Sequence, residues 1–317
     1  MTLSAIPIGR FTPGTEAWVQ ARSTRLGGSE IAAILGLSPW QSRFSLWHAK
    51  AGLVPPDPDN RSMEWGRRLE PVVAAKFCEE HPEYHAAFEQ GQMYAHPERL
   101  WQSASPDVLL GDESALFDVD EHGNLKPTVA TTFCEVKTAA RADAWWDGIP
   151  VYYRCQVLWT MDVLGADRAY LAALISGSDY REFVIEMDDD ARADLAIMRA
   201  AGEEFMASLA ANQPPDLDDS YATYQTVRRL TPDIDPDTEH EVGRDLAEAF
   251  IAANQGLAEA ERVQRRARTE IARHMGTANY AVCEGIRIAR RQPARDGGPA
   301  VLVSTRKHLT PALQESA

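Results

Sequence analysis

Residues 131–137, TTFCEVK, are the stretch that decides the fold of this 317-residue chain. The β-branched and aromatic side chains ahead of Glu135 are typical of a buried strand. Successive side chains of a strand point to opposite faces, so Glu135 and Lys137 share one face while Val136 faces the core. A carboxylate and an ammonium on one face of a sheet indicate a polar site there.

A second carboxylate lies earlier in the sequence, just before another predicted strand. Asp107 stands in Ser105-Pro106-Asp107, directly before the apolar strand residues 108–110. Metal-dependent hydrolysis of a phosphodiester needs carboxylates that converge on a divalent cation, with positive charge nearby. Asp107 and Glu135 on neighbouring strands supply the carboxylates, Lys137 the charge, and the Val136 carbonyl a further oxygen ligand. Taken alone, the Glu-x-Lys triplet is weak evidence and is more typical of an exposed ion pair on a strand.

Helices and strands alternate around these two segments. A short helix is expected over 29–36, capped by Ser29 and ended by Gly36, and longer helices over 43–51, 62–80, 152–164 and 189–211. Strands are expected over 169–176 and 182–187. This pattern predicts an α/β fold with a mixed central sheet flanked by helices.

The chain divides into three parts by composition. Residues 1–211 form the predicted core, 212–237 an acidic linker that contains Pro214 and Pro215, and 238–317 a helical and β extension. In the extension, a helix is expected over 237–274 and strands over 280–290 and 300–304. The long helix could serve as an oligomer contact, a DNA-facing arm or a platform for a partner protein, and its arginines also suit a solvated helix face.

Composition excludes several classes of protein. Hydrophobic residues make up 44% of the chain, and no apolar run is long enough to span a membrane. The amino terminus carries no basic segment followed by an apolar one, so a cytoplasmic location is expected, in the host cell if the protein is viral. The four cysteines form no C-x-x-C pair, which argues against a zinc knuckle, a disulfide framework or an iron–sulfur cluster.

Net charge alone does not identify the partner. The formal charge of −15 opposes phosphate binding, which Lys and Arg drive. Residues 1–50 nevertheless hold five basic against two acidic side chains, and residues 261–317 hold eleven against five. An acidic exterior with a basic groove suits a DNA enzyme, and it suits a protein without a DNA partner equally well.

Five ordered motifs between about residues 15 and 190 resemble one known family. They are Trp18 and Arg22 ahead of Gly28-Ser29-Glu30-Ile31, then Trp65-Gly66-Arg67-Arg68-Leu69-Glu70-Pro71, Ser105-Pro106-Asp107, Glu135-Val136-Lys137, and Gln156-Val157 before Met161. The chain resembles the phage-type alkaline exonucleases related to lambda exonuclease, which include YqaJ-like viral recombinases and belong to the PD-(D/E)xK nuclease superfamily. The resemblance implies a restriction-endonuclease-like core.

The resemblance also implies roles for individual residues. Asp107, Glu135 and the Val136 carbonyl would bind Mg²⁺, for which Mn²⁺ is a possible substitute, and Lys137 would position or activate the attacking water. Gln156 would support this group, and Glu70 would lie at the metal directly or through water. From the residues alone, Glu70 is equally a surface ion-pair partner, and Gln156 a partly buried polar residue.

Arg22, Ser29 and, less directly, Arg25 match positions that bind the 5′-phosphate of the substrate strand. A guanidinium forks onto phosphate oxygens, and the amino end of a helix favours an anion. Ser29 is equally suited to be only a helix cap, and Arg22 only a surface charge.

The resemblance therefore predicts a Mg²⁺-dependent exonuclease that degrades the 5′-ended strand of linear duplex DNA and leaves 3′ overhangs for recombination. It also implies a homo-oligomer, a ring of three around DNA, and a single-strand annealing protein as partner. An endonuclease or single-strand exonuclease of the same superfamily, an inactive DNA-end-binding module and an acidic interaction protein remain alternatives.

Overall fold

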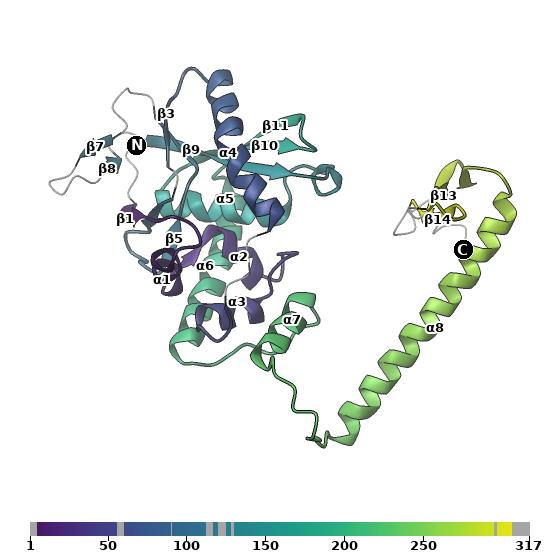
Figure 1. Cartoon of the computed structure of the whole chain (residues 1–317). Helices are drawn as coiled ribbons and strands as arrows, with labels where there is room; N and C mark the ends of the chain where they lie inside the picture. Colours follow the sequence, from purple (N-terminus) through teal and green to yellow (C-terminus); the bar gives the residue numbers. More distant parts are fainter. Residues whose placement is uncertain are drawn as a thin grey trace. The chain divides into compact units, whose positions relative to one another are not determined.

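The chain forms two compact units in a computed structural model, residues 1–234 and 235–317 (Figure 1). The structure describes residues 5–55, 60–89, 91–111, 117–119, 125–127, 130–294 and 297–305, and of 117–119, 125–127, 130 and 131 only the backbone. In the described part, no helix is both long enough and apolar enough to cross a membrane.

A five-stranded mixed sheet forms the centre of the first unit. Its order is β11-β10-β9-β6-β3, with bounds Asp179–Glu186, Arg168–Ile175, Ala130–Ala139, Val108–Gly111 and His85–Phe88. β9 and β10 run parallel, and the other neighbours are antiparallel. Parallel neighbours need a crossover, which the helix α5 (Val151–Leu164) and the preceding turn η1 (Asp143–Trp145) provide. The predicted α/β class is confirmed.

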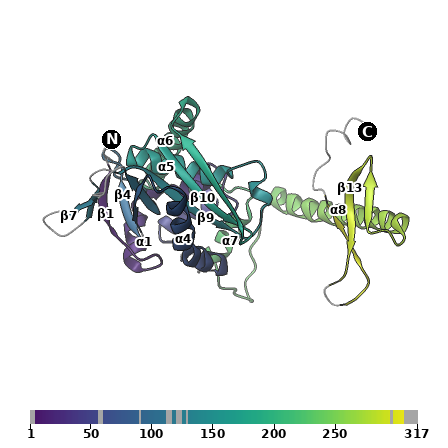
Figure 2. The same cartoon turned by 90° about the horizontal axis from the view of Figure 1, so that it is seen from above.

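The two faces of this sheet carry different side chains. On one face the helix α4 (Arg61–Glu80) packs through Val73, Ala74 and Phe77 onto alternate strand residues, among them Val136. On the other face Phe133 and Leu171 join a larger core with α5. Figure 2 shows α4 and α5 on opposite sides of β9 and β10. Glu135 and Lys137 therefore belong to the α5 face and Val136 to the opposite face, as the alternation of the strand predicts.

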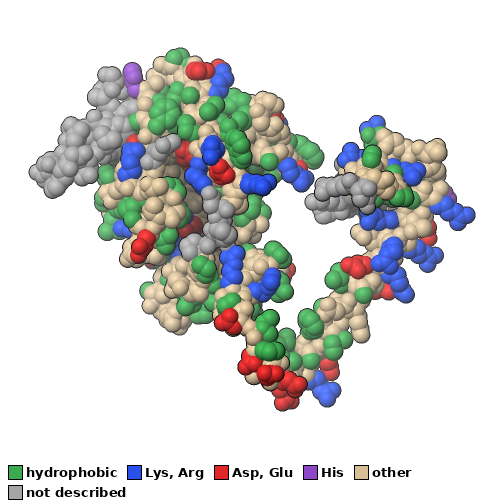
Figure 3. Space-filling model, viewed as in Figure 1, with side chains coloured by type: hydrophobic (Ala, Val, Ile, Leu, Met, Phe, Trp, Pro, Cys, Tyr) green, Lys and Arg blue, Asp and Glu red, His purple; other side chains and the backbone are tan. Residues whose placement is uncertain are grey.

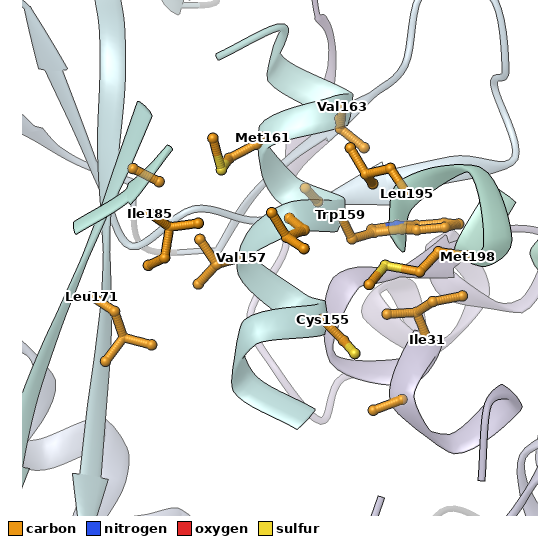
Figure 4. Close-up of a cluster of buried hydrophobic side chains, with 14 of the residues drawn as sticks. Ile31, Cys155, Val157, Trp159, Met161, Val163, Leu171, Ile185, Leu195 and Met198 are labelled. Atoms are coloured by element: carbon orange, nitrogen blue, oxygen red, sulfur yellow. The ribbon is translucent and has the colours of Figure 1, made fainter. Parts of the chain in front are cut away.

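Helix α5 packs against other elements on two sides, and both of these sides are apolar. Figure 4 shows Val157 and Met161 directed towards Leu171 and Ile185 of the sheet, whereas Trp159 is directed towards the helices beyond α5. Those helices are α2 (Gly28–Ile34) and α6 (Asp189–Ala210). A helix packed against other elements on two sides is held rigidly in place.

A second sheet brings two distant motifs together. Its order is β1-β4-β5-β2, with bounds Ile6–Arg10, Gln92–Ala95, Gln102–Ala104 and Leu26–Gly27. β2 and β5 pair in parallel, with Gly27 opposite Ser103. The Trp159 indole N–H lies 3.3 Å from the Leu26 carbonyl and 3.2 Å from that of Ser103, and so ties both strands to α5. The start of α2 thus lies beside the segment that leads to Asp107.

Two boundaries differ from those predicted. The predicted linker 212–237 contains the helix α7 (Tyr221–Leu230), which packs on α3 (Arg43–Lys50) through a 2.7 Å hydrogen bond between the Ser42 and Thr223 hydroxyls. Ser220 caps α7, a signal that the surrounding acidic residues obscured. The short helix α2 begins at Gly28 with Gly27 as its N-cap, so Ser29 lies inside the helix and is not the cap.

The first unit is completed by α1 (Glu16–Ser23) and by the paired strands β7 (Phe117–Val119) and β8 (Leu125–Pro127). The second unit consists of α8 (Arg244–Met275) and an antiparallel sheet of β12 (Tyr280–Cys283), β13 (Ile286–Gln292) and β14 (Val301–Ser304). The strand predicted over 280–290 is thus a hairpin, which turns at Glu284 and Gly285, both with positive φ.

Candidate active site

Glu135 is the most buried polar group of the site, with 1% of its surface exposed. Its Oε1 accepts a hydrogen bond from the Lys137 ammonium at 2.6 Å and another from the Gln156 amide of α5. Its Oε2 is buried without a hydrogen-bond partner among the described residues. A buried carboxylate oxygen without a partner is costly, and a cation would satisfy it.

Asp107 is held against β9 by the backbone. Its carbonyl accepts from the Glu89 amide at 2.9 Å, and its Oδ2 accepts from the Val136 amide at 2.7 Å. The pairing of β6 with β9 begins at Val108, opposite Cys134, so Val136 lies beyond the end of that ladder. The N–H and carbonyl of one strand residue point to the same edge, which directs the Val136 carbonyl towards Asp107 as well.

The charges in this site repel one another. Burial and then the Glu135 carboxylate raise the pKa of Asp107 well above its ordinary value. Burial also raises the pKa of Glu70; Lys137 opposes this shift, and Glu135 adds to it. Such mutual repulsion among acidic groups is relieved when a cation binds between them.

Lys137 keeps its proton in this environment. Burial alone would lower the pKa of its ammonium, but the Glu135 and Asp107 carboxylates outweigh burial and raise that pKa. The Lys137 ammonium therefore places positive charge and hydrogen-bond donors beside Glu135.

One pocket of about 160 Å³ joins both groups of predicted residues. Asp107, Glu135, Lys137 and Gln156 line it together with Arg22 and Ser29. Its size suits ions, waters and a phosphate group better than a base or a sugar.

Arg22 is fixed at this pocket by three neighbours. Its Nη2 lies 2.9 Å from Glu30 Oε1 and donates to Ser29 Oγ at 3.3 Å. Its guanidinium lies over the Trp18 ring, 4.6 Å from the centroid. Gly28 brings α2 this close to α5, because a Cβ at that position would lie 3.1 Å from the Gln156 carbonyl oxygen.

Glu30 and Lys50 do not line the pocket but hold Arg22 at it, although the sequence assigned them no role. Glu30 Oε2 accepts from the Gly27 amide at 2.7 Å and pairs with the Lys50 ammonium at 3.0 Å. Lys50 also donates to the carbonyls of Arg22 at 2.9 Å and Arg25 at 2.6 Å. Glutamate three residues after an N-cap is a capping signal, which identifies Glu30 once Gly27 is known to be the cap. For Lys50, twenty residues further on, the sequence carries no signal.

Three of the predicted site residues, Arg25, Glu70 and Val136, are not among the residues that line the pocket. Arg25 donates to the Ala21 carbonyl at 2.9 Å at the end of α1 and does not line the pocket. Glu70, on α4, does not line it either, although its charge acts on Asp107. The Arg25 side chain thus bonds at the end of α1, and the effect of Glu70 on Asp107 is electrostatic.

The donor atoms available to a metal are oxygens. Among the described residues, no three His, Cys, Asp or Glu side chains come close enough together to hold an ion by themselves. Asp107, Glu135 and the Val136 carbonyl form an incomplete set that waters or a substrate oxygen would complete. Mg²⁺ is bound in this way, by one or two carboxylates with retained waters.

A larger groove of about 1,610 Å³ adjoins the pocket and shares Arg22 and Ser29 with it. Trp40 and Arg43 are among the residues that line it, and its walls come from α1, α2, α3, α4, α6 and α7. Aromatic and basic side chains along a groove are suited to a nucleic-acid strand. The groove is also lined by the acidic side chains Glu30, Glu204, Asp216, Asp218 and Asp219. Arg43 pairs with Glu204 at 2.8 Å.

Comparisons with known proteins agree with these motifs. Residues 17–167 match the family model of the YqaJ-like viral recombinase domain. The chain is 25% identical over 272 residues to the uncharacterized protein YqaJ of Bacillus subtilis, covering 84% of this chain and 79% of that protein. It is 34% identical over 68 residues to protein D345L of African swine fever virus, 20% of each chain.

Among solved structures, an alkaline exonuclease (LHK-Exo) from Laribacter hongkongensis aligns with a TM-score of 0.47 and 22% identity, covering 63% of this chain and 94% of that one. The family match covers the predicted phosphate-binding residues, the strands β6 and β9, and α5. Residues 17–167 of this chain are therefore similar in sequence to the YqaJ-like viral recombinase domains.

Proposed function

We propose that this protein is a Mg²⁺-dependent exonuclease that removes nucleotides from the 5′-ended strand of linear duplex DNA. One observation carries the proposal: Arg22 and Ser29 line the same pocket as Asp107, Glu135 and Lys137. A terminal phosphate held by Arg22 fixes the distance from the strand end to the reacting bond. Cleavage would then start from an end.

The metal fits the site on an observation within it, the unpartnered buried Oε2 of Glu135. Asp107, Glu135 and the Val136 carbonyl would hold the ion. When bound, Mg²⁺ would stabilise the charge that develops on the scissile phosphate. Mn²⁺, which takes similar oxygen ligands, should substitute.

Side chains around the metal site would orient the water and bind the phosphate. Lys137, fixed by Glu135, would orient the attacking water and offset charge on the phosphate oxygens. Gln156 would hold Glu135 in the orientation that leaves Oε2 free. Arg22 would bind the 5′-phosphate with the donors of its guanidinium, and Glu30 would keep that guanidinium directed at the pocket.

The product would be a duplex with a 3′ single-stranded overhang. Such an overhang is the substrate of a single-strand annealing protein, which we propose as the functional partner. The adjoining groove with Trp40 and Arg43 would guide the DNA towards the pocket.

The test compares three substrates with and without Mg²⁺: linear duplex with 5′-phosphates, the same duplex with 5′-hydroxyls, and a closed circle. The proposal expects metal-dependent loss of the linear DNA, faster with 5′-phosphates, and an intact circle. Cutting of the circle at a similar rate would identify an endonuclease. DNA binding without cleavage of any substrate would identify an inactive end-binding module.

A further inference from the structure

Helix α8 carries one apolar face along its 32 residues. Apolar residues follow one another at alternating intervals of four and three, the spacing of a coiled-coil seam. We call this face the α8 seam: Leu246, Phe250, Ala253, Leu257, Ala260, Ala267 and Ile271, with Gln264 as its polar member. The opposite face holds most of the charged side chains.

The two ends of the seam differ in how they are covered. At the carboxyl end the sheet of the second unit packs on α8: Met275 is buried, Ile271 is half-buried, and Arg268 donates to the Leu302 carbonyl. Within the second unit, the large seam residues towards the amino end are not covered, and Phe250 is 70% exposed and Leu257 61% exposed. An apolar stripe of this length on one helix indicates a missing partner.

Charge along α8 changes sign between its halves. Residues 244–259 hold one basic and three acidic side chains, and residues 260–275 hold five basic and two acidic ones. The segment before the helix adds Asp235, Asp237, Glu239 and Glu241. Figure 3 shows the acidic side chains gathered at the start of α8 and the basic ones towards its end. Two copies side by side in parallel would set like charges together, and two antiparallel copies would set opposite charges together.

The sizes of the seam residues favour the same arrangement. Phe250 and Leu257 occupy one of the two seam positions of each heptad, and Ala253, Ala260 and Ala267 occupy the other. A parallel pair would place Phe250 against Phe250 and alanine against alanine, which leaves gaps between the alanine layers. In an antiparallel pair the two kinds of position face each other, so Phe250 meets an alanine of the partner and the layers fill evenly.

We propose that α8 pairs with α8 of a second copy of this chain as an antiparallel coiled coil, with Phe250 and Leu257 of each copy packed against alanines of the other. The contact is two-fold and uses one self-complementary face. It does not depend on the active-site proposal, since every residue in it lies in the second unit.

The first experiment measures the molar mass of the full chain by sedimentation or light scattering at micromolar concentration. The variants are Phe250→Glu and Leu257→Glu, with Ile251→Glu as the matched control. Ile251 is 54% exposed on the same helix but lies about 100° around the axis from Phe250, off the seam. We expect the wild type and Ile251→Glu to have the molar mass of an associated species. Both seam variants should have a lower molar mass, with unchanged helix content by circular dichroism.

A monomeric wild type would overturn the contact. So would a molar mass that both seam variants leave unchanged, as in a ring held by the first unit alone. An equal fall in molar mass for Ile251→Glu would overturn it as well. Direction is tested by disulfide cross-linking in a Cys283→Ser background. Ala247→Cys copies are mixed with copies carrying Asn254→Cys, Glu261→Cys or Arg268→Cys. A mixed cross-link at one of these positions supports the antiparallel pair. The absence of a mixed cross-link at all three positions overturns it.

Discussion

The Val136 amide donates to Oδ2 of Asp107 at 2.7 Å, just beyond the point where the pairing of β6 with β9 ends. The end of the β6–β9 ladder therefore positions the Asp107 carboxylate, and the alternation of side chains along β9 positions the Glu135 carboxylate. The backbone fixes both before any ligand arrives. Preorganisation of this kind lowers the cost of binding a charged substrate.

Asp107→Asn should separate catalysis from stability. Without the charge, cleavage should fall by roughly a hundredfold or more, the equivalent of a few kcal/mol of charge stabilisation. The melting temperature of the metal-free protein should rise, because burial and Glu135 make the Asp107 charge unfavourable there. Calorimetry in chelator and a cleavage assay in Mg²⁺ check the two effects. Asp194→Asn, which removes a carboxylate from a more exposed ion pair, is the control for both measurements. A lower melting temperature for Asp107→Asn than for the wild type would contradict this explanation.

Gln156→Leu should weaken the metal site without touching a ligand. The Gln156 amide donates to Glu135 Oε1, and its loss frees that carboxylate to rotate towards Lys137 alone. Loss of a partner that orients a metal ligand costs roughly ten- to a hundredfold in metal affinity or activity. A Mg²⁺ titration of the cleavage rate should shift to higher concentration, and an unchanged titration curve would speak against this role.

Arg22→Lys should remove the preference for a 5′-phosphate. The guanidinium contacts Ser29 and Glu30 at once, an arrangement that a lysine ammonium does not reproduce. Rates on 5′-phosphorylated and 5′-hydroxyl duplexes should converge, while the rate on the 5′-hydroxyl duplex changes little. Arg25→Lys, which lies off the pocket wall, serves as the control and should keep the preference.

Glu30→Gln should change how stability depends on pH. Burial would raise the pKa of Glu30, but Arg22 and Lys50 outweigh it and lower that pKa from 4.5 to about 2. A lowered carboxyl pKa adds stability that is complete above the unfolded value and is lost as pH falls through the folded value. As the pH falls from 4.5 to about 2, the unfolding free energy of the wild type should drop by roughly 3 kcal/mol more than that of the variant. Urea unfolding at a series of pH values measures this difference, and parallel curves would refute it.

The sequence predicted the parts of the fold that depend on local pattern. The strand at β9, the helix at α4 and the strands at β10 and β11 follow from local pattern, and the face shared by Glu135 and Lys137 follows from strand alternation. Helix α7 was missed because its N-cap stands in an acidic, proline-containing segment that looks like a linker.

The site was predicted less completely, because part of it depends on tertiary contacts. The ordered motifs identify Asp107, Glu135, Lys137 and Gln156, but nothing local shows that Lys50 reaches back to Arg22 and Glu30. Arg25 and Arg22 look alike in the sequence. The direction of each side chain at the end of α1 separates the one that lines the pocket from the one that bonds to its own helix.

The most direct test of the central claim is digestion of a linear duplex that carries 5′-phosphates and a different label on each strand, with the wild type and with Lys137→Ala, in Mg²⁺ and in chelator. The account predicts loss of mononucleotides from the 5′ ends only, dependence on Mg²⁺, and no digestion by Lys137→Ala although that variant still binds the duplex. Release from the 3′ ends, or full activity of Lys137→Ala, would contradict it.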